Sequence, residues 1–523
     1  MDAALSKLLL KLPQRAEKVK HKALIDSFVD VEPLLNVLER ESDQILYGRR
    51  GTGKTHVLKY LMTHITDNND ITLYVDLRTI GSTGGLYSDT NQPLSQRSTR
   101  LLLDIMSYVH DEIRNILFKG DTDLDYKNIT KSLDDFASSI TEIEVVGTFK
   151  SEITTKEHDS SSAAVKADLS TSKGLSAGLS TGSSSASEEE IKETREGTYD
   201  YHLHLGRLYK SLQHIINTIP NNKLWILLDE WSSIPVDLQP YVADLLRRAV
   251  LPVEGIFVKI AAIEKRTKFA IKTSPSSYVG FELGSDISAD LSMDDFMVFD
   301  NDEQKARKFF IKLIHKHVLS IATSDGERFD YDEEALIKNI FTQENVFMEF
   351  VRASEGIPRD SFNILSEAVI KNYGKIVNMQ SLRKASKTWY ERDKEPAVGA
   401  NETALNLLHW IVAEVIAHRQ ARAFLLPSKA THPLIDELFD ARVLHLLKKN
   451  ISSHDQPGSR YDVYKIDYGC YIDLMSTRRA PLGFLYKEDK NRVSVPVDDY
   501  RAIRRAILEM DKFFESERQQ RLC

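Results

Sequence analysis

The sequence is poor in cysteine and has no long apolar run. Cys470 and Cys523 are the two cysteines among 523 residues. They give neither a disulfide framework nor zinc-ligand spacing, so a reducing cytoplasm is the expected compartment. No stretch approaches the roughly 18 apolar residues of a membrane span, and we expect no membrane partner. Met1–Lys22 has Leu8–Leu10 between lysines but lacks a long apolar core and a small-residue cleavage site, which predicts a short amphipathic helix.

A surplus of basic residues is also absent. Lysine and arginine number 69 against 77 acidic residues. The net charge of -8 argues against a wholly basic nucleic-acid coat protein, although it leaves local basic faces open. The 15 histidines are scattered, and none lies at metal spacing with acids or cysteines, so no nuclease, deaminase or protease centre is indicated. A chain of this length is expected to form about two to four domains.

A glycine-rich segment, Gly48–Thr55, follows the apolar run Ile45–Tyr47 and opens a helical pattern. Its spacing, G-x-x-x-x-G-K-[ST], is that of a phosphate-binding loop, in which glycines let successive backbone N–H groups turn around a phosphate at a helix N-terminus. Lys54 would reach the β- and γ-phosphates, and Thr55 would ligate Mg²⁺. The expected cofactors are ATP and Mg²⁺, and the expected binding residues are Gly48, Arg49, Arg50, Gly51, Thr52, Gly53, Lys54 and Thr55.

A second apolar run, Leu224–Leu228, ends in the acidic pair Asp229 and Glu230. This pattern is typical of a buried parallel strand that delivers carboxylates to the carboxyl edge of a sheet, as a Walker B strand does. Asp229 would hold Mg²⁺ through water. Glu230 would orient or deprotonate the attacking water, because a general base must lie close to the γ-phosphate.

Roughly 170 residues separate the two motifs, more than one strand–helix step consumes, so an insertion is expected between them. Ile71–Leu77 is predicted as the next core strand and Leu101–Leu117 as a helix. From about residue 142 to 197 the composition changes to Ser, Thr, Lys and Glu. A projecting β-hairpin and a mobile loop are both open here, and the serine-rich, aromatic-poor composition favours the mobile loop.

Polar residues farther along the chain are candidates for contact with the γ-phosphate. Arg247 and Arg248 end a helical pattern. Either one is a candidate arginine finger for a neighbouring subunit, and the alternative is a cationic helix end that complements the helix dipole. The apolar run Gly255–Ile263 predicts a parallel strand with Glu264 at its carboxyl edge. That position suits a sensor of the γ-phosphate, and an ordinary strand end is the alternative.

The segment Gly356–Arg359 joins two predicted amphipathic helices. Gly356 suits the end of the first helix, and Pro358 suits the first turn of the second. Arg359 is then held at a helix N-terminus, where a cation is unfavourable unless an anion approaches it. A nucleotide phosphate would supply that anion.

In this order, the motifs resemble those of AAA+ ATPases of the origin-recognition (ORC/CDC-like) type with a C-terminal winged helix. The resemblance spans roughly residues 25 to 375. It implies that Arg359 matches the sensor 2 arginine, that Glu264 lies near sensor 1, where the family commonly has a neutral polar residue, and that Arg247 or Arg248 is the trans-acting finger. Sequence segments such as YGRRGTGKTH look more like those of bacterial ATPases of this group, some associated with mobile elements or phage defence, than like those of replication initiators.

The predicted fold class is α/β: an AAA+ P-loop NTPase with a parallel sheet and a helical lid, followed by a winged-helix-like domain. We predict an N-terminal helix in residues 1–24, the nucleotide-binding domain in 25–300 with its insertion at about 142–197, the helical lid in 301–378 and the winged-helix-like domain in 379–523.

The C-terminal part has three apolar patterns that predict short helices, at Leu405–Val412, His432–Leu438 and Val443–Leu447. Two alternating segments, Arg460–Asp467 and Arg492–Val497, predict a wing. Double-stranded DNA is one expected partner, and a protein-binding module is the alternative, since acids nearly balance bases here. The candidate DNA-contacting residues are Arg442, Lys448, Lys449, Arg460 and Lys465.

Two functions follow from these patterns. In the first, the chain is an oligomeric ATPase whose hydrolysis drives remodelling of DNA or protein, with catalytic residues Lys54, Glu230, Glu264, Arg359 and Arg247 or Arg248. In the second, it is a nucleotide-dependent switch or scaffold that binds ATP tightly and recruits an effector protein. The presence of both Asp229 and Glu230 favours hydrolysis.

Overall fold

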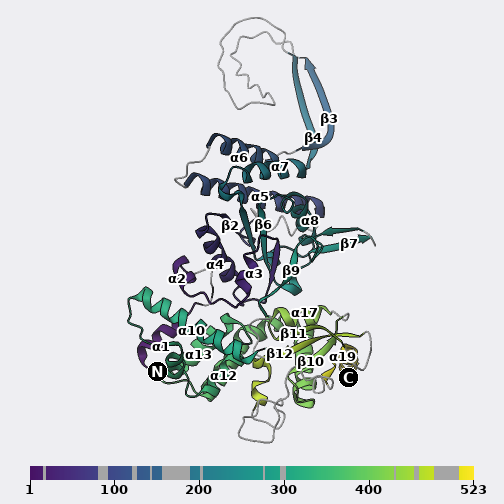
Figure 1. The fold of residues 1–523 in the computed structure, drawn as a ribbon. Helices are drawn as coiled ribbons and strands as arrows, with labels where there is room; N and C mark the ends of the chain where they lie inside the picture. The colour runs from purple at the N-terminus through teal and green to yellow at the C-terminus, as the bar shows by residue number, and fades with distance from the viewer. Residues whose placement is uncertain are drawn as a thin grey trace. The chain divides into compact units, whose positions relative to one another are not determined.

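A five-stranded parallel sheet carries the predicted phosphate-binding loop in the described part of the computed structural model (Figure 1). In order across the sheet, its strands are β2 (Ile71–Asp76), β5 (Leu224–Asp229), β6 (Ile256–Ala262), β1 (Gln44–Tyr47) and β9 (Ser288–Ser292). All neighbouring strands run parallel. The structure describes residues 1–13, 15, 19–80, 92–119, 126–141, 144–155, 189–200, 204–274, 277–294, 302–428, 432–452, 459–475 and 506–522.

The central strands are apolar because helices cover them. Every residue of β5 and of β1 is buried, which explains the continuous apolar runs in the sequence. Since the strands are parallel, their carboxyl ends share one edge of the sheet. That edge brings together the loop after β1 and the acidic pair after β5. The predicted strands at 71–77, 224–228 and 255–263 are confirmed.

At the opposite edge of the sheet, a buried lysine joins β1 to β6. Lys259 lies opposite Gln44 in the parallel ladder. Its Nζ donates to Gln44 Oε1 at 2.5 Å and to the carbonyls of Arg40 and Ser42 at 2.7 Å each. Burial lowers the pKa of Lys259 to about 7, and Asp43 opposes this shift. Three oxygen acceptors therefore satisfy an ammonium group that has no contact with solvent.

The helices of this region present one apolar face to the sheet. In α4 (Lys54–Asp67), for example, Val57, Leu58, Leu61 and Ile65 are the buried residues, as a 3.6-residue period requires. The predicted helix at 101–117 lies within α5. The other elements are α1 (Ala3–Leu10), α2 (His21–Asp26), α3 (Leu34–Leu38), α5 (Leu94–Lys119), α6 (Tyr126–Thr141), α7 (Leu205–Ile216), α8 (Gln239–Ala249), β7 (Ala270–Ser274) and β8 (Ser277–Gly280).

Residues 141–203 form a compact unit of their own. In it, β3 (Glu144–Thr155) pairs antiparallel with β4 (Glu189–Asp200) along the full length of both strands. The flanks of the serine-rich insertion therefore adopt the hairpin alternative, where composition favoured a mobile loop. Regular antiparallel pairing satisfies the backbone N–H and C=O groups of both flanks, and side-chain composition carries little information about such pairing. Residues 156–188 lie outside the described residues.

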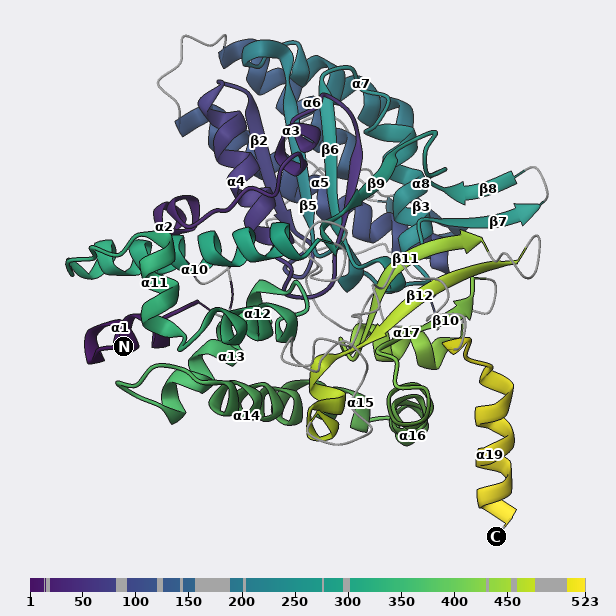
Figure 2. The same ribbon diagram turned by 60° about the horizontal axis from the view of Figure 1, so that its bottom comes forward.

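A helical region follows the sheet and leads to a small antiparallel sheet with the strand order β10–β12–β11 (Figure 2). Together with the parallel sheet, these elements confirm the predicted fold class. The helices are α10 (Glu303–Asp325), α11 (Glu333–Ile340), α12 (Glu344–Ala353), α13 (Pro358–Lys371), α14 (Met379–Trp389), α15 (Glu395–Gly399), α16 (Glu402–Ile411), α17 (Pro433–Asp440) and α19 (Met510–Leu522), and the strands are β10 (Ala423–Pro427), β11 (Leu444–Ser452) and β12 (Arg460–Ile466).

One predicted C-terminal element is wrong. The pattern Val443–Leu447 predicts a helix, but residues 444–447 form the start of strand β11, which pairs antiparallel with β12. Residues 443–445 and Leu447 are all buried, so the strand lacks the alternation that distinguishes a strand from a buried helix. The predicted helices at 405–412 and 432–438 and the strand at 460–467 are confirmed, whereas Arg492–Val497 lies outside the described residues.

Residues 1–140 and 204–523 group into one compact unit, so the domain boundaries near residues 300 and 378 stay predictions. Among the described residues, every helix is too short or too polar to span a membrane.

Candidate functional site

The loop between β1 and α4 has the backbone of a phosphate-binding loop. The N–H of Gly48 donates to the carbonyl of Ala262 on the neighbouring strand at 3.2 Å, which fixes the start of the loop. Gly51 and Gly53 have φ values of 85° and 101°, in the left-handed region that glycine adopts without strain. Thr52 Oγ1 donates to the carbonyl of Arg49 at 2.9 Å. Helix α4 then begins at Lys54 and aims its N-terminus at the loop.

Lys54 lies folded back on this loop. Its Nζ donates to the carbonyls of Gly48 at 2.7 Å and Arg49 at 3.1 Å. Burial lowers the pKa of Lys54, while the carboxylates of Asp229 and Glu230 raise it. An ammonium group in this position is available to a phosphate oxygen, because the carbonyl contacts are neutral and are weaker than a contact with an anion.

Thr55, Asp229 and Glu230 meet at the carboxyl edge of the sheet. Thr55 Oγ1 donates to Asp229 Oδ2 at 2.6 Å, and the hydroxyl of Tyr74 donates to the same oxygen at 2.7 Å. Glu230 has a φ of 56°, which turns it out of the strand, and its N–H donates to Asp229 Oδ1 at 2.8 Å. Burial, with a smaller contribution from the Asp229 charge, raises the pKa of Glu230, as suits a general base.

Arg359 reaches the same loop from the helical region. It is the second residue of α13, behind Pro358, and its N–H donates to the carbonyl of Gly51 at 3.3 Å. Its buried Nε has no hydrogen-bond partner within the described residues. Burial lowers the pKa of the guanidinium, and the nearby cation Arg442 adds to that shift. A buried cation with an unsatisfied donor fits an anionic ligand.

Lys54, Thr55, Glu230 and Arg359 line one cavity of about 350 Å³, within the size range of small-ligand pockets, and Asp229 is hydrogen-bonded to Thr55. Lys54, Thr55, Arg50, Glu230 and Arg359 supply its polar wall. Its apolar wall includes Leu24, Phe28, Val29, Val31, Leu34, Phe309, Leu313 and Phe362. The residues present therefore fit a magnesium nucleotide, with cations and loop N–H groups for phosphates, a hydroxyl and a carboxylate for the metal, and an apolar wall for the base.

The side chain of Arg49, which was predicted to bind the nucleotide, lies outside the cavity. Its side chain is buried and is absent from the cavity wall. Nε donates to Asp294 Oδ1 at 2.7 Å, Nη2 donates to the carbonyl of Glu355 at 3.0 Å, and Nη1 contacts His445 Nδ1. The guanidinium therefore binds protein groups, so Arg49 would contribute only its backbone to a nucleotide.

Glu264, Arg247 and Arg248 also lie away from the cavity wall. Glu264 follows the carboxyl end of β6, as predicted, but its carboxylate is paired with Lys449. Arg247 and Arg248 follow Asp244 by three and four residues on α8, and they pair with its carboxylate at 2.6 and 2.7 Å respectively. Arg248 is the more exposed, with 55% of its side chain accessible against 26% for Arg247. Within this chain, both arginines thus have intramolecular partners.

Arg78 and His317 line the cavity but were not predicted from the sequence. Arg78 follows β2 and lies with Nη1 3.8 Å from Glu230 Oε1, while its Nη2 contacts Asp76 Oδ2 at 2.6 Å. Its position directly after a core strand was the available signal. His317 lies inside α10, and its Nδ1 donates to the carbonyl of Leu313 at 2.9 Å. No pattern marked it, because a histidine on the apolar face of a helix is indistinguishable from a core residue.

The buried imidazole of His317 predicts a pH-dependent stability. Burial, together with the neighbouring His56, lowers the pKa of His317 to about 3. Below about pH 6.5 the His317 imidazole binds a proton in the unfolded chain but not in the folded chain. The free energy of unfolding therefore falls as pH falls, by up to about 1.4 kcal/mol per pH unit. His317→Phe should flatten this decline between about pH 6.5 and 4 in urea unfolding of the nucleotide-free protein. The exposed His21→Phe is the control, and an unchanged slope in His317→Phe would contradict the assignment.

Two of the candidate DNA-contacting residues are ruled out by burial. Arg442 is 5% exposed and pairs with Asp360 at 2.5 Å, and Lys465 is fully buried and pairs with Glu355 at 2.6 Å. Arg442 precedes β11 and Lys465 lies on β12, and charge alone does not reveal that both are buried. Lys448, Lys449 and Arg460 are exposed, and Lys449 is paired with Glu264.

Comparison with known proteins gives one family. The ORC-CDC6-like family model matches residues 12–346. Among solved structures, the chain is similar to the Orc1 protein of Aeropyrum pernix in complex with DNA, with 14% identity and a TM-score of 0.31 over 88% of this chain and 93% of that one. It is also similar to Drosophila ORC bound to DNA, with 10% identity and a TM-score of 0.29 over 88% and 93% of the two chains. No curated protein matches.

Proposed function

Since the chain belongs to the ORC-CDC6-like family of AAA+ proteins, we propose that it binds and hydrolyses ATP as an oligomer and couples its nucleotide state to the binding or remodelling of DNA. One observation carries the proposal. Residues 50–55 of the phosphate-binding loop, Glu230 after β5 and Arg359 of α13 line a single cavity, and Asp229 is hydrogen-bonded to the cavity residue Thr55. That set contains every kind of group that phosphoryl transfer to water requires within one chain.

We assign different roles in hydrolysis to different residues at the cavity. Thr55 and Asp229 would hold Mg²⁺, which when bound neutralises charge on the phosphates. Lys54, Arg50 and Arg359 would bind phosphate oxygens through N–H groups, and Glu230 would accept a proton from the attacking water. Arg78 lies between Asp76 and Glu230 and would keep the Glu230 carboxylate directed into the cavity.

The apolar wall of the cavity would receive the nucleotide base. Phe28 stacks on Tyr60 with ring centroids 3.9 Å apart, and His317 packs against Phe362 with centroids 4.8 Å apart. A planar base between such rings loses contact with water and gains dispersion contacts. The wall draws on the N-terminal segment, α10 and α13, so base binding would tie these elements to the sheet.

Oligomerisation would place an arginine of one subunit at the nucleotide of the next. Arg248 is the better candidate finger, because more than half of its side chain is exposed while Asp244 holds its orientation. DNA contact would use the exposed side of the β11–β12 ribbon, where Lys448 and Arg460 lie. A bacterial branch and a role in phage defence or mobile-element biology stay predictions from sequence phrases alone.

ATP turnover with and without double-stranded DNA tests the proposal. We expect turnover that Lys54→Ala abolishes, that DNA stimulates, and whose stimulation weakens between low and moderate salt, because DNA binding releases counterions. The double variant Lys448→Glu with Arg460→Glu should need a higher DNA concentration for half-maximal stimulation of ATP turnover. Its turnover without DNA should equal that of the wild type. Turnover that is indifferent to DNA at both salt concentrations would remove DNA from the proposal and leave the ATPase.

A second candidate function has an observation in its favour. The guanidinium of Arg49, within the phosphate-binding loop, contacts His445 on β11. A nucleotide-dependent switch that recruits an effector protein needs a connection from the nucleotide to another part of the chain, and this contact joins the loop to the antiparallel sheet. Slow turnover together with a large difference between the nucleotide-free and ATP-bound states would favour this function over remodelling.

A further inference from the structure

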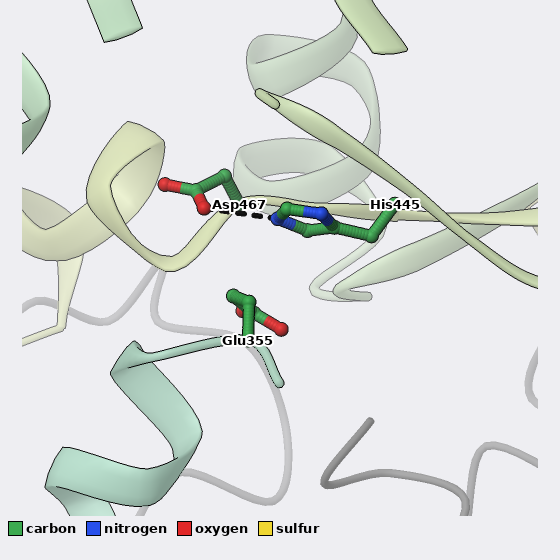
Figure 3. A group of neighbouring side chains, drawn as sticks. All are labelled: Glu355, His445 and Asp467. Carbon is green, nitrogen blue, oxygen red and sulfur yellow. Dashed lines mark hydrogen bonds and ion pairs between the residues drawn. The ribbon is translucent and has the colours of Figure 1, made fainter. Parts of the chain in front are cut away.

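Three buried side chains, Glu355, His445 and Asp467, lie within 4.8 Å of one another (Figure 3). By residue type they resemble a metal-binding group, but cations already occupy their ligand atoms. Lys465 Nζ lies 2.6 Å from Glu355 Oε2, Lys394 Nζ lies 2.5 Å from Asp467 Oδ2, and Arg49 contacts His445 Nδ1. A divalent cation here would face three positive side chains. The cluster is therefore a network of ion pairs.

The contacts of His445 fix its protonation pattern. Arg49 can only donate, so His445 Nδ1 accepts, and His445 Nε2 then donates to Asp467 Oδ2 at 2.9 Å. A neutral imidazole with one acceptor and one donor satisfies both neighbours. His445 is opposite Lys465 in the β11–β12 ladder, so strand pairing places both side chains in the cluster.

From Asp467 the network continues to α13. Lys394 bridges Asp467 at 2.5 Å and Asp360 at 3.0 Å. Asp360 also pairs with Arg442 at 2.5 Å and is fully buried. Asp360 directly follows Arg359 in the first turn of α13. Whatever fixes the Asp360 carboxylate therefore also fixes the start of the helix that carries Arg359.

The two ends of the network meet again at the nucleotide loop. Arg49 is two residues before Gly51, and the carbonyl of Gly51 accepts from the N–H of Arg359 at 3.3 Å. The path from Arg49 through His445, Asp467, Lys394 and Asp360 thus starts and finishes at the phosphate-binding loop. Each of these side chains is at most 2% exposed, so no water layer screens their interactions.

We propose that Arg49, His445, Asp467, Lys394 and Asp360 form a coupling relay, through which the antiparallel sheet positions the phosphate-binding loop and Arg359 for the nucleotide. The inference rests on the proposed nucleotide binding and adds its regulation. The relay residues are positioning residues, since they lie outside the cavity wall and act through the Arg49 backbone and Arg359. By reciprocity, nucleotide binding must then alter the antiparallel sheet by the same coupling free energy.

His445 offers a matched pair of variants in the full chain. The amide of His445→Gln accepts from Arg49 and donates to Asp467, as the imidazole does, whereas His445→Phe fills the space but makes neither bond. We expect His445→Phe to raise the KM for ATP about tenfold or more with a smaller change in kcat, and His445→Gln to stay within about threefold of wild type. His418→Phe, an exposed histidine outside the relay, is the control.

Hydrogen exchange gives the reciprocal readout. We expect the slowly hydrolysed analogue ATPγS to slow amide exchange in β11 of the wild type and of His445→Gln but not of His445→Phe. If His445→Phe does not fold, the wild-type measurement decides, since unchanged exchange in β11 on saturation with ATPγS would overturn the relay. Equal KM values for the Phe and Gln variants would overturn it as well. Absence of Lys54-dependent nucleotide binding in the wild type is a different result, which refutes the proposed function itself.

Discussion

Replacing Glu230 with glutamine should lower the rate of ATP hydrolysis by about two to four orders of magnitude while leaving ATP bound. Glutamine keeps the size and the hydrogen-bonding reach of the side chain but cannot take a proton from water. The backbone of residue 230 already occupies the left-handed region and donates to Asp229, and glutamine preserves both features. The expected phenotype is therefore a trapped ATP complex, measured as single-turnover hydrolysis together with the affinity for a fluorescent ATP analogue.

The control for this prediction is Glu254→Gln, which makes the same chemical change at an exposed position before β6. It should turn over ATP at the wild-type rate. Turnover by Glu230→Gln that equals the control would take Glu230 out of the reaction and move the search for the base elsewhere. Loss of ATP affinity in Glu230→Gln would instead indicate that the carboxylate supports the shape of the cavity.

Replacing Gly51 with alanine should cost the protein most of its affinity for nucleotide. A Cβ on Gly51 would lie 2.9 Å from Arg359 Cβ and 3.0 Å from Arg359 Nε. The residue also has a φ of 85°, where an L-side chain costs about 1–2 kcal/mol. To relieve the clash, α13 must withdraw from the loop. We expect the affinity for nucleotide to fall about a hundredfold, since both the loop and Arg359 would be displaced from their binding positions.

A matched glycine separates crowding from backbone strain. Gly284 has a φ of 89°, but a Cβ there would have open space around it. Gly284→Ala should thus carry the backbone cost alone and leave nucleotide affinity unchanged by titration calorimetry. If both variants bind nucleotide like the wild type, the close approach of Arg359 to the loop is not required for binding.

The cavity was predictable from the sequence because its parts are local. The spacing within Gly48–Thr55, the acidic pair behind β5 and the Gly-x-Pro-Arg turn each depend on neighbouring residues. The sheet then has to bring them together, since parallel strands deliver their carboxyl ends to one edge. The structure assembles these three segments around one cavity, while the catalytic roles assigned to them stay predictions.

The remaining features depend on contacts between distant residues. Arg442 and Lys465 have the charge of DNA-binding residues, yet Asp360 and Glu355 neutralise them inside the protein. Arg49 has the position of a nucleotide ligand, yet His445 lies 396 residues away in sequence and binds its side chain. Composition and period carry no information about such partners. The strand at Leu444 was missed for the same reason, because its pairing with β12 outweighs its helical pattern.

The buried ammonium of Lys259 has a mechanical consequence. It ties β1 to β6 at the sheet edge remote from the cavity, through Gln44 and the carbonyls of Arg40 and Ser42. Strands joined in this way cannot slide along each other without stripping the ammonium group of its acceptors, which is costly in the interior. Strand β1, which leads directly into the phosphate-binding loop, is therefore held in register with β6. If the chain cycles nucleotides as proposed, we expect any displacement at the cavity to fall on elements outside the sheet, such as α13 with Arg359, and to act through the relay that holds the start of α13.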